Sequence, residues 1–227
     1  MKLKAPKNKR LELLFVFLAG GATFYFLLTN FGFLMPLREV LSVACFSSCQ
    51  SEKSFHPAIK GENFLNYEKS LQQLLEKEAN REGISILVEK SKFRLTIFSN
   101  LKPLKSYPIV LGSSPTGDKL HEGDRKTPEG VYYIRDLYPH PSWSKFIWID
   151  YPRPESWREH FQAKFSGHIN WQLPIGGEIG IHGVPAGQDS LIEKRFNWTL
   201  GCISLKNHDV DEIYSFVDTG TVVEIVP

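Results

Sequence analysis

The residues from Ile181 to Asn207 read IHGVPAGQDSLIEKRFNWTLGCISLKN and contain a histidine and a cysteine twenty positions apart. His182 follows the apolar–polar alternation of a short strand. Cys202 follows Gly201, and a residue without a side chain lets the backbone pass close to a reacting carbonyl. This pair indicates a cysteine nucleophile with a histidine base.

The chemistry requires a thiolate. A cysteine with an ordinary pKa of about 8.5 is only a few per cent ionised at neutral pH. An imidazole that lowers this pKa to about 6 raises the thiolate fraction roughly thirtyfold, which corresponds to about 2 kcal/mol. We therefore expect His182 to lower the pKa of Cys202. The competing interpretation of Cys202 is a small buried hydrophobe.

The motifs around these two residues resemble those of the YkuD-type L,D-transpeptidases. That family carries a His-Gly pair, about fifteen residues, and then Ser/Thr-x-Gly-Cys, with an asparagine a little further on. Here the fifteen residues Val184–Trp198 separate the two motifs. The resemblance continues upstream in Gly117–Lys119, Glu122–Tyr132 and Lys145–Pro152, and it covers roughly residues 84–227. It implies one catalytic domain of ordinary size.

The resemblance also implies roles for individual residues. Cys202 is the nucleophile and His182 the general base and acid, and the carbonyl of Gly183 orients the imidazole. Backbone N–H groups at Gly201 and Cys202 bind the oxyanion. The substrate-binding candidates are Thr199, Ser204, Lys206 and Asn207. The reaction requires no metal and no organic cofactor.

One position departs from the family pattern. An arginine commonly stands two places after the nucleophile and is taken to hold a substrate carboxylate, whereas this chain has Ser204. A hydrogen bond to a charged group contributes about 1.5–3 kcal/mol, so its absence should change which peptide is bound and how tightly. Lys206, Lys194 or Arg195 can supply the charge from a neighbouring position.

The implied reaction is a transfer of peptidoglycan stem peptides. The cysteine attacks the carbonyl of the third residue of a tetrapeptide stem, expels the terminal D-alanine, and passes the acyl group to an amine. That amine belongs to a second stem or to a wall-attached protein. Two alternatives stay open. In a cysteine hydrolase or carboxypeptidase, water replaces the amine, and in a tethered wall-binding module the fold persists without turnover.

The charge balance gives no electrostatic support for a nucleic-acid partner. The chain has 227 residues and a net charge of +2, but five basic residues precede position 11. Positions 11–227 hold 22 basic and 25 acidic residues, a balance of −3. A folded part with this balance has no basic surface that could neutralise phosphates.

The N-terminal part predicts a membrane anchor. Leu13–Leu37 is a run of twenty-five residues without a formal charge, enough to cross a bilayer, and the basic residues before it place the N-terminus in the cytoplasm. The alternative is a signal peptide cleaved at Ser42–Ala44, but its apolar region is too long. We expect a bacterial envelope enzyme, anchored in the inner membrane, with its catalytic domain on the periplasmic side.

The expected organisation has five parts. They are a basic leader (1–10), a transmembrane anchor (11–37), a linker (38–60), a helix that packs on the domain (61–83) and the catalytic domain (84–227). The linker contains Cys45 and Cys49. We expect both to be unpaired, because a disulfide between them would close a very small, strained loop.

Periodicity within the domain predicts a mainly β sandwich with a few short helices. Apolar and polar residues alternate in 84–89 and 93–98 around a turn at 90–92, which is typical of a hairpin. Helical periodicity covers 65–79, 155–165 and 209–217. Further strands are expected at 107–112, 131–135 and 221–226. The aromatic-rich run 143–151 can line a substrate groove or fill the core, and we expect core for most of it.

A zinc site is the remaining alternative for the chemistry. His168, His182 and Cys202, with His208 or Asp209, offer the ligand types. Their spacing matches no H-x-x-x-H or C-x-x-C pattern, so the sequence predicts no metal centre.

Overall fold

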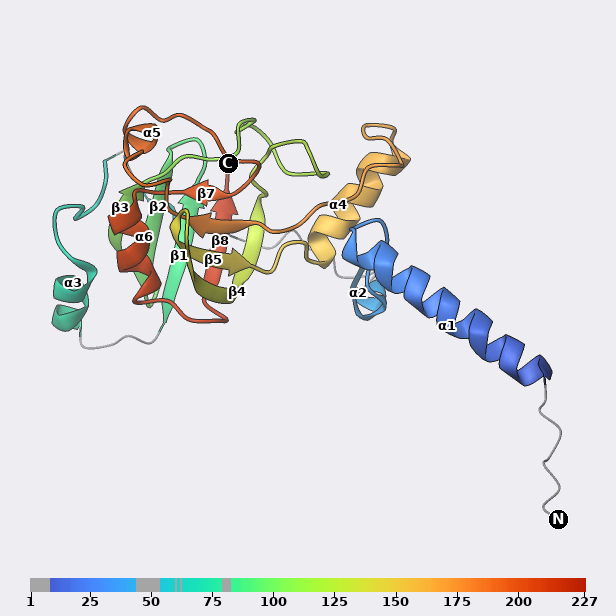
Figure 1. The fold of residues 1–227 in the computed structure, drawn as a ribbon. Coiled ribbons are helices and arrows are strands. Elements are labelled where there is room, and N and C mark those ends of the chain that lie inside the picture. Colours follow the sequence, from blue (N-terminus) through green and yellow to red (C-terminus); the bar gives the residue numbers. More distant parts are fainter. Residues whose placement is uncertain (1–8, 44–53, 60, 62, 79–82) are drawn as a thin grey trace, which may run out of the picture.

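A computed structural model describes residues 9–43, 54–59, 61, 63–78 and 83–227 (Figure 1). Its helices are α1 (Lys9–Asn30), α2 (Leu37–Val43), α3 (Leu71–Glu78), α4 (Pro154–Phe165), α5 (Ser190–Glu193) and α6 (Asn207–Tyr214). Its strands are β1 (Ile84–Glu89), β2 (Arg94–Ser99), β3 (Lys102–Pro108), β4 (Gly130–His140), β5 (Ser144–Ile149), β6 (Gly180–His182), β7 (Ile203–Ser204) and β8 (Val222–Val226). The predicted mainly β class is confirmed, with short helices around the sheet and an apolar helix at the N-terminus.

One mixed sheet forms the domain, with its strands in the order β3-β2-β1-β8-β4-β5-β6-β7. β8 pairs in parallel with β1, and β7 with β6, while the other neighbours are antiparallel. β4 belongs to both halves of the sheet, and its register against β5 shifts between Ile134 and Asp136. Such an irregularity bends a strand and increases its twist. The sheet therefore curls, and its two halves form two layers that face each other.

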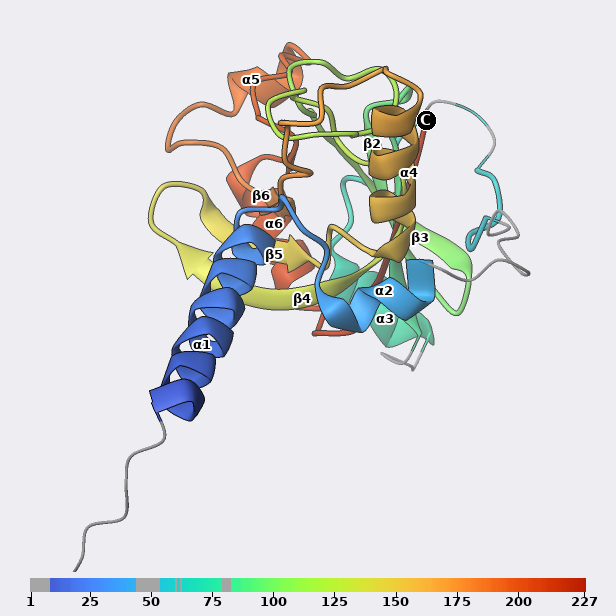
Figure 2. The ribbon, with the colours of Figure 1, turned by 90° about the vertical axis from the view of Figure 1, so that its right-hand side faces the viewer.

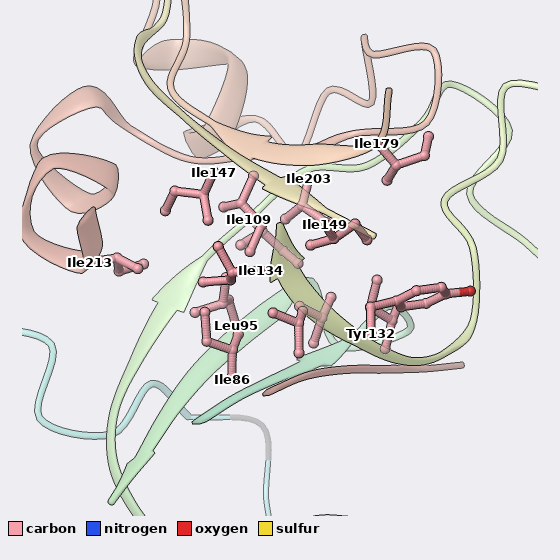
Figure 3. Close-up of a cluster of buried hydrophobic side chains, with 14 of the residues drawn as sticks. Ile86, Leu95, Ile109, Tyr132, Ile134, Ile147, Ile149, Ile179, Ile203 and Ile213 are labelled. Atoms are coloured by element: carbon pink, nitrogen blue, oxygen red, sulfur yellow. The ribbon is translucent and has the colours of Figure 1, made fainter. Parts of the chain in front are cut away.

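The two halves enclose one hydrophobic core (Figure 3). Ile86 and Leu95 come from β1 and β2, whereas Ile147 and Ile203 come from β5 and β7, and all four are fully buried. Burying such a side chain contributes about 1.5–3 kcal/mol. The core therefore fixes the short strands β6 and β7 against the rest of the domain.

The predicted hairpin is confirmed, since β1 and β2 are antiparallel and are joined by a turn. Its alternation does not mark a solvent-exposed face, however, because every residue of β2 is buried. Polar side chains on these strands are instead paired. Arg94 lies 2.6 Å from Glu89, and Thr96 is hydrogen-bonded to Ser106 at 2.9 Å. Polar residues in this alternating pattern therefore mark side chains with partners in the protein, and not a face exposed to water.

Parts of the expected linker lie on the domain. His56 is buried, and its two ring nitrogens each lie 2.8 Å from a partner, Glu224 in β8 and Ser85 in β1. Helix α2 packs against α4, and Val43 at its end packs against the main core (Figure 2). Cys45 and Cys49 lie outside the described residues, so their unpaired state stays a prediction.

Helix α1 ends at Asn30, before the uncharged stretch does. Glu12–Asn30 is exposed, and by length and composition it can cross a membrane. Gly32 has a φ of +70°, a conformation that ends helices and that glycine adopts without strain. Its carbonyl accepts a hydrogen bond from the Ile175 N–H at 3.0 Å. The chain therefore turns onto the domain directly after the helix.

Two other predictions are confirmed only in part. Helix α4 matches the period over 155–165, but Phe165 on its expected apolar face is exposed. The strand expected over 107–112 is interrupted, because β3 ends at Pro108 and Val110 and Gly112 make only single bridges, to Ser204 and Thr199. These bridges place the 110–112 segment beside the turn that carries the candidate cysteine.

Candidate active site

Two short parallel strands bring His182 and Cys202 to the same part of the sheet. In β6 and β7, His182 pairs with Ser204, so Cys202 lies two residues before the partner of His182. Both residues line one open cleft of about 1860 Å³, together with Thr199 and Leu200.

The hydrogen bond at Nδ1 fixes the tautomer of His182. Nδ1 lies 2.7 Å from the carbonyl oxygen of Gly183. A carbonyl can only accept, so Nδ1 carries the proton and Nε2 is the basic atom. The same carbonyl accepts a second hydrogen bond, from Ser204 Oγ at 3.1 Å.

Three aromatic side chains enclose the imidazole. Ring centroids lie 4.5 Å away for Trp143 and 5.8 Å for Phe146, which both stack on it, and 5.6 Å for Trp198, which meets it edge-on. His182 is only 2% exposed. Burial lowers the pKa of His182 to about 4, although the bond to Gly183 opposes this and the charge of His140 adds to it. The imidazole of His182 is therefore neutral at physiological pH.

Gly183 has no room for a side chain. A Cβ at this position would collide with Asn207 Oδ1 and would lie 2.6 Å from the carbonyl oxygen of Trp143. That carbonyl accepts from the Gly183 N–H at 3.0 Å, and Asn207 Oδ1 accepts from the Val184 N–H, also at 3.0 Å. Asn207 therefore stabilises the turn that follows His182.

Burial also governs the thiol. Cys202 Sγ donates to the carbonyl oxygen of Glu178 at 3.5 Å. Burial raises the pKa of Cys202 to about 11, although the Gly180 N–H and the charge of Lys119 lower it. The expectation of a lowered pKa is thus wrong for the resting site, because the buried neutral imidazole provides no compensating positive charge. The resting pair is a thiol and a neutral imidazole.

Thr199 shapes the turn that presents Cys202. Its hydroxyl donates to the carbonyl of Cys202 at 2.7 Å and accepts from the N–H of Gly201 at 3.2 Å. Gly201 has a φ of +146°, and a Cβ there would lie 2.8 Å from the carbonyl oxygen of Lys126. The Gly201 N–H is already engaged, so the N–H of Cys202 is the better placed of the two expected oxyanion donors.

Three of the expected substrate-binding residues do not line the cleft. Ser204 is fully buried, with its hydroxyl on the Gly183 carbonyl, and Asn207 holds Val184. Lys206 forms a surface ion pair with Glu193 at 2.7 Å. Lys194 and Arg195 are exposed and also lie outside the cleft lining. Ser204 and Asn207 therefore support the histidine instead of facing a ligand.

The cleft also contains residues that the sequence pattern did not single out. Trp143, Trp148 and Trp198 line it, together with Lys119 and Glu178. Trp143 and Trp148 follow the groove alternative for the run 143–151, which aromatic residues alone cannot distinguish from core. The only feature of the sequence that pointed to Lys119 is its position in a segment that resembles the family.

No group of three or more His, Cys, Asp or Glu side chains within the described ranges is arranged to hold a metal ion. The members of the alternative zinc set have other partners. His168 is hydrogen-bonded to Ser166 at 2.6 Å, and Asp209 contacts Tyr67 and His208 at 3.0 Å each.

The family model for the L,D-transpeptidase catalytic domain, YkuD, matches residues 83–225. Among curated proteins the chain is similar to YafK, a candidate L,D-transpeptidase of Escherichia coli (strain K12). The two are 30% identical over 122 residues, which is 53% of this chain and 39% of YafK. The chain thus spans less than half of the length of that relative.

Solved structures with a similar chain path include Pgp2, a helical cell shape determining protein of Campylobacter jejuni. It is 26% identical with a TM-score of 0.46, over 63% of this chain and 46% of that one. Bdellovibrio bacteriovorus Bd1075 is 22% identical with a TM-score of 0.45, over 63% and 48% of the two chains. A mutant of the Enterococcus faecium L,D-transpeptidase is 16% identical with a TM-score of 0.41, over 64% and 50%.

Proposed function

The chain belongs to the family of YkuD-type L,D-transpeptidase catalytic domains, and from this premise we propose that it transfers peptidoglycan stem peptides through a thioester on Cys202. The observation that carries the proposal is the fixed histidine. His182 has a protonated Nδ1 bonded to Gly183, a free basic Nε2, and a place in the same cleft as the sulfur.

Acylation starts from the neutral pair. Cys202 leaves the Glu178 carbonyl, and its proton moves to Nε2 of His182 as the sulfur attacks the carbonyl carbon of the third residue of a stem. The Cys202 N–H stabilises the oxyanion of the tetrahedral intermediate. When the intermediate collapses, the C–N bond breaks and the imidazolium protonates the departing amine of D-alanine. A thioester and a neutral imidazole remain.

Deacylation reverses the roles. The amine of a second stem attacks the thioester carbonyl and loses its proton to Nε2, and the C–S bond then breaks. The sulfur leaves as a thiolate and recovers the proton from His182. A neutral base suits both half-reactions, since each begins with removal of a proton from a nucleophile.

Ser204 favours a second candidate, a cysteine hydrolase or carboxypeptidase in which water resolves the thioester. Its hydroxyl bonds the Gly183 carbonyl and does not line the cleft, so the carboxylate contact that the family arginine is taken to supply has no counterpart at this position. A wall-attached protein is a further acceptor. Both candidates retain the same nucleophile and base.

The test is mass spectrometry of purified full-length protein incubated with tetrapeptide stems. A cross-linked stem dimer supports transfer, whereas tripeptide with free D-alanine supports hydrolysis. Unchanged stems that nevertheless bind support the wall-binding module. Cys202→Ala should abolish the acyl adduct and both products with an unchanged circular dichroism spectrum, and turnover that persists in this variant refutes the cysteine mechanism.

For location we infer an inner-membrane anchor with the catalytic domain in the periplasm. Glu12–Asn30 has a mean hydropathy of 1.7 in its most apolar window, and the basic leader precedes it. The full-length chain should stay in the membrane pellet through high-salt and alkaline washing. Release of a shortened chain beginning after Ala44 would instead identify a cleaved signal peptide.

A further inference from the structure

Exposed apolar side chains occur on the segment that follows α1, on α2, and at the end of α4. In both views α1, α2 and α4 lie on the same side of the sheet (Figures 1 and 2). Soluble surfaces rarely expose many large apolar side chains together, so such a group marks an interaction site. We call this set the juxtamembrane patch: Phe31, Phe33, Leu34, Leu37, Val40, Phe165 and Trp171.

The patch is held to the domain by specific contacts. Gly32 accepts the hydrogen bond from Ile175, and a Cβ on Gly32 would lie 3.3 Å from the backbone nitrogen of Gly176. Met35 packs against the main core, and its carbonyl accepts a hydrogen bond from Tyr25 Oη in α1 at 3.0 Å. Among the described residues, the end of α1 and the segment that follows it therefore share one interface with the domain.

Two aromatic residues at the end of α4 extend the patch away from α1. Phe165 is 78% exposed and Trp171 is 55% exposed, and their rings meet edge-to-face at 5.0 Å. Lys164 Nζ lies 5.8 Å from the centre of the Trp171 ring. Tryptophan and lysine side chains with an apolar body and a polar tip are typical of the boundary between lipid and water.

Charge does not explain the patch. Arg38 and Glu39, the charged residues of α2, pair with each other at 3.1 Å, so this helix brings no net charge. An apolar surface without a basic cluster fits the acyl boundary of a bilayer better than it fits an anionic headgroup layer alone.

We propose that the juxtamembrane patch seats the catalytic domain on the bilayer that α1 spans, with Phe165 and Trp171 inserted at the lipid–water boundary. This inference rests on the proposed membrane anchor and not on the transfer reaction. Residues of the 29–39 segment form part of the wall of the cleft that contains Cys202. The seated domain therefore opens its cleft beside the membrane surface, and it reaches stem peptides that lie close to that surface.

Tryptophan fluorescence tests the seating directly. All five tryptophans lie at or after Trp143, so none belongs to α1, and four of them line the cleft while Trp171 does not. The full-length chain is reconstituted at one copy per lipid nanodisc, with lipids brominated near the headgroup end of the acyl chain. Bromine quenches only nearby indoles, and one copy per disc excludes self-association as the cause of quenching.

We expect bromolipid quenching in the wild type and its loss in Trp171→Phe. Trp157→Phe is the matched control, since Trp157 is a buried residue of the same helix α4, and this variant should keep the quenching. Equal quenching of wild type and Trp171→Phe, or none in either, would overturn the seating. Failure of the chain to remain in the discs would overturn the anchor as well, and the stem-peptide assay would still report on the transfer reaction by itself.

Discussion

Buried titratable groups in the two halves of the sheet have different surroundings. In the half formed by β1, β2 and β8, Glu89 lies against Arg94, and Glu224 lies against His56. Burial alone would raise the pKa of Glu224, but hydrogen bonds from residues 54–56 hold it below its usual value. In the half formed by β5, β6 and β7, His182 is buried and Cys202 is half-buried, and neither has an opposite charge in contact.

The difference separates the paired buried groups from the two groups that we propose to react. A buried carboxylate that accepts several hydrogen bonds, such as Glu224, keeps its charged form, whereas a buried group without such partners is driven to its neutral form. The pKa of His182 falls to about 4 and that of Cys202 rises to about 11. Strongly shifted groups in a cleft are candidates for catalysis. The comparison predicts that substitutions in the first half change stability and substitutions in the second change reactivity.

The largest effect is expected from Glu89→Gln. This substitution leaves the fully buried guanidinium of Arg94 without its carboxylate, and breaking a buried pair from one side typically costs about 3–5 kcal/mol. The free energy of unfolding from chemical denaturation measures it. The matched control is Glu155→Gln, which removes a carboxylate from the exposed pair with Arg158 and should cost less than about 1 kcal/mol. Equal losses of unfolding free energy in the two variants would mean that the buried pair contributes no more to stability than the surface pair.

The next effect is the pH dependence of stability at His182. Its pKa is about 4 in the folded chain and 6.5 when unperturbed, so the folded state binds the proton less well than the unfolded state. The stability tied to the neutral ring is complete above pH 6.5 and is lost as the pH falls through 4. The wild type should lose about 3 kcal/mol more than His182→Gln between pH 7 and pH 4.

Denaturation curves of the two proteins at each pH isolate this contribution. The other titrating groups, including His56 and Glu224, are common to both and cancel in the difference. Parallel stability profiles for wild type and His182→Gln would mean that the imidazole keeps an ordinary pKa.

The third effect concerns the thiol. With a pKa near 11 in place of 9, Cys202 has about one hundredth of the usual thiolate fraction at neutral pH. The more basic thiolate is also more nucleophilic, which offsets about tenfold of this loss. We expect alkylation by iodoacetamide to be about tenfold slower than for an unperturbed cysteine, and to keep increasing with pH above 9.

Mass spectrometry of the peptide that contains Cys202 follows the reaction separately from Cys45 and Cys49. The same peptide in the urea-unfolded chain supplies the unperturbed rate. A rate that reaches its plateau below pH 7 would instead identify a preformed thiolate–imidazolium pair, as the sequence suggested.

The sequence predicted features that depend on local spacing. The hairpin of β1 and β2 and the helix α4 follow from periods of two and 3.6 residues. The Thr-x-Gly-Cys motif identified the family, whereas the hydrogen bonds of Thr199 to Gly201 and Cys202 appear only in the structure.

Features that depend on contacts between distant segments could not be predicted from local spacing. Residues 54–56 cover β8 from about 170 positions away in the chain, so no local pattern marks Glu224 as buried. The direction of the pKa shift at Cys202 depends on how deeply the sulfur lies, which spacing does not encode. The position of Trp143 against His182 depends on the pairing of β5 with β6, which places Phe146 opposite His182.

The smallest effect is expected at Ser204, and it discriminates between two roles for this residue. The sequence suggested a contact with substrate, whereas the structure places its hydroxyl on the carbonyl that orients His182. Ser204→Ala removes one hydrogen bond worth about 1 kcal/mol, so kcat should fall about fivefold while KM stays unchanged. The control Ser215→Ala removes a similar hydroxyl-to-carbonyl bond, to Asp211 in α6, and should leave both constants unchanged. A rise in KM with kcat unchanged would restore the substrate contact, because only a residue that binds the ground state changes KM alone.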